Sequence, residues 1–226
     1  MILNIETSSK ICSVALYNEG HFFYSLESDT EMDHSTKLAP FVEKCMEEVS
    51  KHNKKLSAVA VSIGPGSYTG LRIGLSLAKG ICFGLGLPLI GVPTLEILAV
   101  KALFQTAIYS EDLVIIPLID ARRMEVYTCA YNLNLNELME PQPLILEENS
   151  YMKFNGKPLI LIGDGVEKAK TILKVPVSEW IDQMPKATDM GALAEKSFRE
   201  KKFIDLAYST PLYLKNFQAT QQKNRL

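Results

Sequence analysis

Apolar runs and polar turns alternate along the first half of the chain in an order that predicts a series of strands and helices. Buried or alternating patterns predict strands at 2–6, 11–17, 21–26, 56–63 and 87–92. Helical spacing of apolar residues predicts helices over 35–52, 69–85 and 94–105. Thr94 is the predicted N-cap of the third helix. The predicted order is therefore β-β-β-α-β-α-β-α.

The second half restarts with the same opening pattern after a polar break at residues 106–112. A buried strand at 113–119, a polar turn and a strand at 125–131 are predicted, followed by a strand at 159–162. Two further helices are predicted, one ending near residue 173 and one over 190–201. The repeat favours an α/β protein of two lobes. We assign residues 1–106 to an N-terminal lobe and 107–226 to a smaller C-terminal lobe.

Composition narrows the class of protein. The 226 residues carry a net charge of -2 and an isoelectric point near 6.0, which argues against a dedicated nucleic-acid binder. Four widely spaced cysteines lie in apolar patterns without a C-x-x-C, so we expect buried free thiols and a reducing compartment. The chain opens directly on a strand pattern, and its apolar stretches are short for a membrane span. We therefore expect a cytoplasmic protein.

Two turns are candidates for phosphate chemistry. The turn at Gly64-Pro-Gly66 joins a predicted strand to a predicted helix, but its glycine spacing matches neither a Walker A loop nor a dinucleotide fingerprint. A structural turn is the preferred interpretation. The first turn offers the hydroxyls of Thr7 and Ser8, and Asp120 follows the corresponding strand of the second half. These three residues are weak candidates for nucleotide binding, and a solvated turn is the alternative for the first.

The helix after the glycine turn has small residues at intervals of four: Gly70, Gly74, Ala78 and Cys82. Glycine destabilises a helix interior by about 1 kcal/mol relative to alanine, so close approach of another element is a plausible compensation. Packing on a partner and packing on the chain's own sheet both remain open. The three histidines lack metal-ligand spacing and no G-x-S-x-G elbow occurs, so we predict no catalytic residue and no metal ligand.

Several segments in order resemble the bacterial TsaB (YeaZ) family. They are Ile5-Glu-Thr-Ser8, Cys12-Ser-Val-Ala15, His34-Ser35, the eleven residues from Gly64 to Gly74, Gly91-Val-Pro-Thr-Leu95, the stretch from Ile119 to Tyr127, and Pro211-Leu-Tyr-Leu-Lys-Asn216. The glycine-turn segment and the D-A-R-R-M-E-V-Y segment at 120–127 are highly specific. The resemblance covers residues 1–131 and returns near the end of the chain.

The resemblance implies an actin-like ATPase superfamily fold of two RNase H-like lobes, the second reduced. It implies a non-catalytic scaffold subunit in the complex that transfers threonylcarbamoyl to the adenosine next to the anticodon of tRNAs reading A-starting codons. The implied partners are a TsaD-like catalytic subunit and a TsaE-like ATPase, with tRNA bound through the complex and a homodimer when the chain is alone. ATP and metal are expected in the partner subunits.

The residues agree with a non-catalytic role. The metal-binding subunit of such pairs has an H-x-x-x-H helix, but here Leu38 follows His34 at that spacing. The first turn also lacks the glycine of an active phosphate loop, so we expect no tightly bound nucleotide. The resemblance places the partner surface on the first two helices, where we predict contacts from Leu38, Phe41, Val42, Cys45, Met46, Val49, Gly70, Leu71, Gly74, Leu75 and Ala78.

Two other functions are weighed against this one. An ATP-dependent small-molecule kinase or ATPase of the same superfamily would place Thr7, Ser8 and Asp120 near phosphate. A peptidase is the least favoured, because the sequence contains no evident pair of nucleophile and base.

Overall fold

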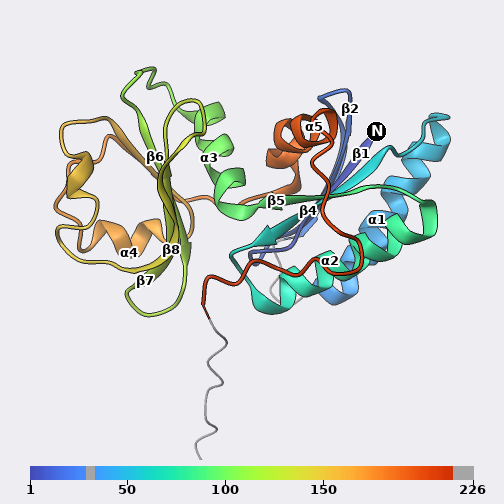
Figure 1. Ribbon diagram of the computed structural model, residues 1–226, viewed down its shortest axis with the longest axis horizontal. Coiled ribbons are helices and arrows are strands. Elements are labelled where there is room, and N and C mark those ends of the chain that lie inside the picture. Colours follow the sequence, from blue (N-terminus) through green and yellow to red (C-terminus); the bar gives the residue numbers. More distant parts are fainter. Residues whose placement is uncertain (29–33, 216–226) are drawn as a thin grey trace, which may run out of the picture.

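The computed structural model describes residues 1–28 and 34–215, which form two lobes built on five-stranded sheets (Figure 1). Residues 29–33, which precede the first predicted helix, lie outside the described residues, as does Asn216 of the segment 211–216. The first sheet has the order β3-β2-β1-β4-β5. Its strands are β1 (Ile2–Glu6), β2 (Cys12–Asn18), β3 (His21–Ser28), β4 (Ala58–Gly64) and β5 (Leu89–Pro93). β1, β4 and β5 run parallel, so they end at the same edge of the sheet.

Three helices accompany the first sheet: α1 (His34–Lys51), α2 (Tyr68–Leu85) and α3 (Thr94–Gln105). The predicted β-β-β-α-β-α-β-α order is confirmed. α1 and α2 cover one face, where Leu3 and Ile5 of β1 enter a core with Leu38 and Cys45 of α1 (Figure 1). The N-cap prediction is wrong, because Pro93 occupies the cap position and the hydroxyl of Thr94 is buried without a partner.

The second sheet has the order β10-β9-β6-β7-β8. Its strands are β6 (Val114–Asp120), β7 (Glu125–Tyr131), β8 (Glu137–Ile145), β9 (Leu159–Ile162) and β10 (Glu179–Ile181), and it is accompanied by η1 (Met152–Phe154) and α4 (Val166–Lys170). The predicted strands β6, β7 and β9 are confirmed, whereas β8 and β10 are additional. β8 is a half-exposed edge strand with two prolines, so its pattern carries little apolar signal.

Helix α3 lies between the two sheets (Figure 1). Leu95 and Leu98 pack with residues of the second sheet such as Ile160, whereas Ile97 and Val100 belong to the core behind the first sheet. From residue 97 to residue 102 every position of this helix is buried. The lobes are therefore joined through a shared core element and not only through a linker.

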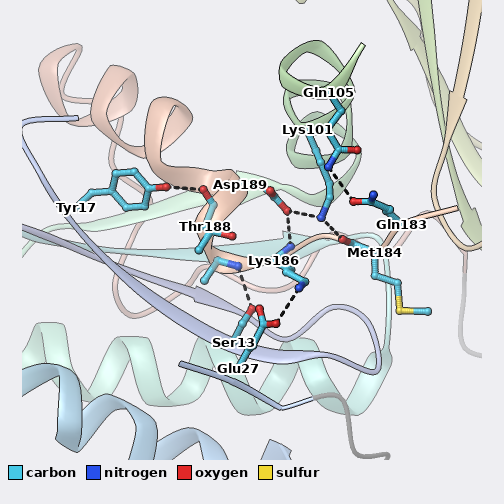
Figure 2. Close-up of polar contacts among 11 residues, drawn as sticks. Ser13, Tyr17, Glu27, Lys101, Gln105, Gln183, Met184, Lys186, Thr188 and Asp189 are labelled. Carbon is cyan, nitrogen blue, oxygen red and sulfur yellow. Dashed lines mark hydrogen bonds and ion pairs between the residues drawn. The ribbon is translucent and has the colours of Figure 1, made fainter. Parts of the chain in front are cut away.

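After β10 the chain returns to the first lobe, where η2 (Ala187–Met190) and α5 (Gly191–Arg199) cover the face opposite α1 and α2 (Figure 1). Figure 2 shows the contacts that hold this return. The backbone N–H of Ala187 donates to Ser13 Oγ at 2.9 Å, and the hydroxyl of Tyr17 donates to the carbonyl of Thr188 at 2.6 Å. The boundary predicted at 106/107 falls between α3 and β6. The predicted C-terminal lobe included η2 and α5, but these two elements pack on the first sheet.

A buried ion pair fastens the return to α3 (Figure 2). The ammonium of Lys101 lies 3.0 Å from Asp189 Oδ2 and donates to the carbonyl of Met184 at 2.8 Å. Lys101 is only 5% exposed, and these two partners compensate its buried ammonium group.

Residues 204–215, here named the C-terminal strap, then run along the first lobe. The strap bonds to β5 through Ile204 N and Leu89 O at 2.9 Å, and to β4 through Leu212 N and Ile63 O at 2.7 Å. At its end Lys215 pairs with Glu125 of the second lobe.

The four cysteines are buried free thiols, which confirms that expectation. Among the residues that the structure describes, no helix has the length and apolar character needed to cross a membrane.

Candidate functional site

The first turn and the glycine turn meet at one edge of the first sheet, because β1 and β4 are parallel neighbours that end there. The backbone N–H of Ser67 donates to the carbonyl of Ser8 at 2.6 Å. The hydroxyl of Thr7 donates to the carbonyl of Gly70 in the first turn of α2 at 2.8 Å. The two turns therefore bind each other and form one closed corner.

The glycines of this corner are needed for that contact. A Cβ atom on Gly66 would lie 2.4 Å from the carbonyl oxygen of Ser8, and one on Gly70 would lie 2.0 Å from that of Thr7. A Cβ on Gly74 would lie 2.3 Å from Thr7 Oγ1. Gly70 and Gly74 thus accommodate the chain's own first turn. The alternative left open by the sequence is settled in favour of internal packing for these two residues.

Glu6 gives the corner its polar interior. Its side chain is fully buried, and Oε1 accepts a 2.5 Å hydrogen bond from the backbone N–H of Ser8, whereas Oε2 has no partner. Burial raises the pKa of Glu6 to about 7, although the hydrogen bond from the N–H of Ser8 opposes the shift. The N–H of Ser8, which a phosphate loop would direct outward, is used by this internal carboxylate.

The weak nucleotide candidates lie in two different sheets. Thr7 and Ser8 are buried after β1, and both contribute to the closed corner. Asp120 ends β6, where it is exposed and pairs with Lys168 at 2.8 Å. Among the described residues no group of three or more histidine, cysteine, aspartate or glutamate side chains is arranged to hold a metal ion. His34 is buried at the start of α1, and Leu38 lies in the core.

The predicted partner residues are mostly turned inward. All except Phe41 and Met46 are buried in this chain, which places Leu38, Val42, Cys45, Val49, Gly70, Leu71, Gly74, Leu75 and Ala78 inside the first lobe. Their helical spacing reflects the face that packs on the first sheet. They are therefore not available as an exposed surface in the described structure.

The opposite face of α2 carries a second small-residue series with the same interval of four. Ser76, Gly80 and Gly84 are exposed along α2, and Phe83 beside them is 83% exposed. A Cβ on Gly80 or Gly84 would meet no atom within 4 Å. We name these four residues the outer α2 stripe. The sequence contained this signal, but spacing alone does not say which of two parallel series points outward.

The turn after β6 has a different construction. The side-chain Oδ1 of Asp120 accepts the backbone N–H of Arg122 at 2.5 Å, and Asp164 Oδ1 accepts that of Asp120 at 2.8 Å. Glu125 pairs with Lys215. The carboxylates of Asp120 and Glu125 thus form structural ion pairs with lysines.

Comparison with solved structures of the same architecture identifies the class of fold. The chain superposes on an inorganic polyphosphate/ATP-glucomannokinase from Arthrobacter with a TM-score of 0.52 at 10% identity, covering 88% of this chain and 98% of that one. It superposes on YeaZ from Pseudomonas aeruginosa with a TM-score of 0.78 at 27% identity, covering 94% and 99%. The fold is that of the actin-like ATPase superfamily, with the first turn closed from within.

Sequence relatives then give the family. The model of the family described as "TsaD: tRNA N6-adenosine threonylcarbamoyltransferase" matches residues 28–221. The tRNA threonylcarbamoyladenosine biosynthesis protein TsaB of Escherichia coli is 29% identical over 95% of this chain and 94% of its own length. TsaB of Buchnera aphidicola subsp. Schizaphis graminum is 34% identical over 75% and 81%. The chain belongs to this TsaD-related family and, within it, to the TsaB (YeaZ) group.

Proposed function

We propose that this chain is a subunit of the machinery for tRNA threonylcarbamoyladenosine biosynthesis, and that it holds and activates a TsaD-like catalytic subunit without catalysing the transfer itself. The near full-length match to TsaB carries the proposal. The closed corner supports the non-catalytic part, because Thr7, Ser8 and Glu6 bind one another and the glycine turn.

The outer α2 stripe is the partner surface that we propose. Small residues let a second helix approach closely, and Phe83 offers a large apolar side chain that a partner would remove from water. A run of small residues alone would not indicate an interface, but an exposed phenylalanine beside it does favour one. The same surface would pair two copies of the chain when no catalytic subunit is present. A TsaE-like ATPase completes the proposed complex.

Nucleotide and metal belong to the other subunits in this proposal. The backbone groups of the first turn are engaged within the chain, so we expect no tight binding of ATP by the isolated protein. Calorimetric titration of ATP and Mg²⁺ into the pure chain tests this, since micromolar binding would contradict it. The buried free thiols fit the reducing cytoplasm, where we place the complex.

Reconstitution tests the main proposal. TsaD-like and TsaE-like subunits, tRNA, ATP and threonylcarbamoyl-adenylate are combined with and without this chain, and modified adenosine is quantified. We expect modification to depend on the chain, and equal product without it would refute the proposal.

A matched pair of variants tests the surface. Phe83→Asp places a charge in the outer α2 stripe, and Phe104→Asp places one at a comparably exposed phenylalanine of α3. We expect Phe83→Asp to abolish co-purification with the TsaD-like subunit while Phe104→Asp retains it. Equal binding by both variants would assign the partner surface elsewhere.

A further inference from the structure

The turn between β6 and β7 places two adjacent arginines in an unfavourable backbone conformation. Arg122 has φ 70° and Arg123 has φ 52°, so both lie in the left-handed region. Glycine and asparagine accept this region readily, whereas long side chains rarely adopt it. Strain of this kind persists mainly where function requires the particular residue. An Asn-Gly pair would suit the turn better, so the two arginines call for a reason beyond folding.

The surrounding contacts hold this turn in one conformation. Asp120 Oδ1 accepts the N–H of Arg122, and the ammonium of Lys168 donates to the carbonyl of Arg123 at 2.8 Å and to that of Glu125 at 2.9 Å. Lys168 also pairs with Asp120 at 2.8 Å. The backbone beneath both arginines is thus fixed before any ligand arrives, which lowers the entropy cost of binding.

The charges around the turn leave the arginines uncompensated. Asp120 and Glu125, at its base, are paired with Lys168 and Lys215, and the third nearby carboxylate, Asp164, is half-buried and accepts the backbone N–H of Asp120. Arg122 and Arg123 are exposed, and within residues 1–28 and 34–215 neither guanidinium makes a hydrogen bond or an ion pair. Two positive charges therefore stand together on a protein whose net charge is -2.

We propose that Arg122 and Arg123 form a contact point for the phosphate backbone of tRNA. The proposal rests on the function proposed above, because the tRNA of that reaction is the polyanion available to this surface. A guanidinium presents its N–H donors in a fixed fork that matches a phosphate group. Contacts of this kind position a nucleic acid and carry no sequence information. An acidic patch of a partner protein is the competing occupant, and the experiment separates the two.

The decisive variant is Arg122→Asn combined with Arg123→Gly. It removes both charges but suits the left-handed backbone, so we expect the melting temperature to be equal or higher. The affinity of the chain in complex with a TsaD-like subunit for labelled tRNA is measured by fluorescence anisotropy across a salt series. Each phosphate contact contributes roughly 0.7–0.9 to the slope of log K against log salt. Loss of two contacts should lower the slope by about 1.4–1.8 and weaken binding roughly 25- to 60-fold near 0.1 M salt.

Two further proteins make the result specific. Lys54→Ala with Lys55→Ala removes the same charge from two exposed residues in the loop between α1 and β4 of the first lobe. This control variant should bind tRNA like the wild type. Arg122→Lys with Arg123→Lys keeps the charge without the fork and should lose less than the Asn-Gly variant. Unchanged affinity and slope in the Asn-Gly variant would overturn the proposal.

Loss of the TsaD-like subunit from that variant on a sizing column, with the tRNA slope preserved, would also overturn it and would assign the turn to a protein contact. In parallel, tRNA modification is measured with and without the wild-type chain. Equal modification in both cases would refute the proposed function, whereas the anisotropy series alone decides the role of the two arginines.

Discussion

Replacing Gly70 by alanine tests whether this glycine is needed for packing within the chain, against the first turn, and not for packing against a partner. The new Cβ would stand 2.0 Å from the carbonyl oxygen of Thr7, so the backbone of one of the two turns has to move. Overpacking of this kind costs about 1–3 kcal/mol. The displaced Thr7–Gly70 hydrogen bond adds about 1 kcal/mol. Better helix propensity returns up to about 1 kcal/mol. We expect a net loss of about 1–3 kcal/mol.

The control is Gly80→Ala on the same helix, where no atom lies within 4 Å of the added Cβ. Only the propensity gain applies there, so unfolding free energy should rise by about 0.8–1 kcal/mol. Both variants are compared by urea unfolding and by thermal melting, with shifts of about 2–4 °C per kcal/mol for a chain of this size. If Gly70→Ala is as stable as Gly80→Ala, the closed corner does not depend on glycine and the packing argument fails.

Three further outcomes follow from the structure. Because the pKa of Glu6 is raised to about 7 from 4.5, the folded state retains a proton that the unfolded chain releases, so stability should fall by on the order of 3 kcal/mol between pH 4.5 and 7. Glu6→Gln should flatten this part of the urea-unfolding pH profile, and an unchanged profile would contradict the buried carboxyl. Lys101→Met leaves Asp189 unpaired and should cost about 3–5 kcal/mol in urea unfolding, against under about 1 kcal/mol for Lys170→Met in the exposed pair with Glu167. Gly84→Trp should leave the melting temperature near that of wild type but prevent co-purification with a TsaD-like subunit, and retained binding would exclude Gly84 from the interface.

The order of elements in the first lobe was predictable because each strand and helix there has a strong period and a clear turn. β1 is buried along its whole length, and α1 has an apolar stripe at helical spacing. β8 was not predictable, since its residues are half exposed and its stability comes from pairing with β7. The return of η2 and α5 to the first sheet depends on contacts between residues more than 170 positions apart, such as Ser13 and Ala187.

The candidate site was predictable in part. The glycine turn was correctly singled out, and its structural interpretation agrees with the contacts to Thr7 and Ser8. Which face of α2 is buried was not predictable, because Gly70 and Gly80 belong to two series of small residues with the same spacing. Only the position of the first turn above Gly70 and Gly74 distinguishes them. The left-handed conformation of Arg122 and Arg123 likewise follows from the contacts of Asp120 and Lys168 and has no signature in the residue types.

The position of α3 has a mechanical consequence. Two-lobed proteins that close on a ligand need a hinge that bends at low cost, but here the element between the lobes is a helix buried on all sides from residue 97 to residue 102. Rotating one sheet against the other would open two cores at once and separate Lys101 from Asp189. The two lobes should therefore move as one rigid body. Whatever docks on α2 is held at a fixed distance and angle from the turn after β6, so orientation is transmitted through the protein without any change of shape.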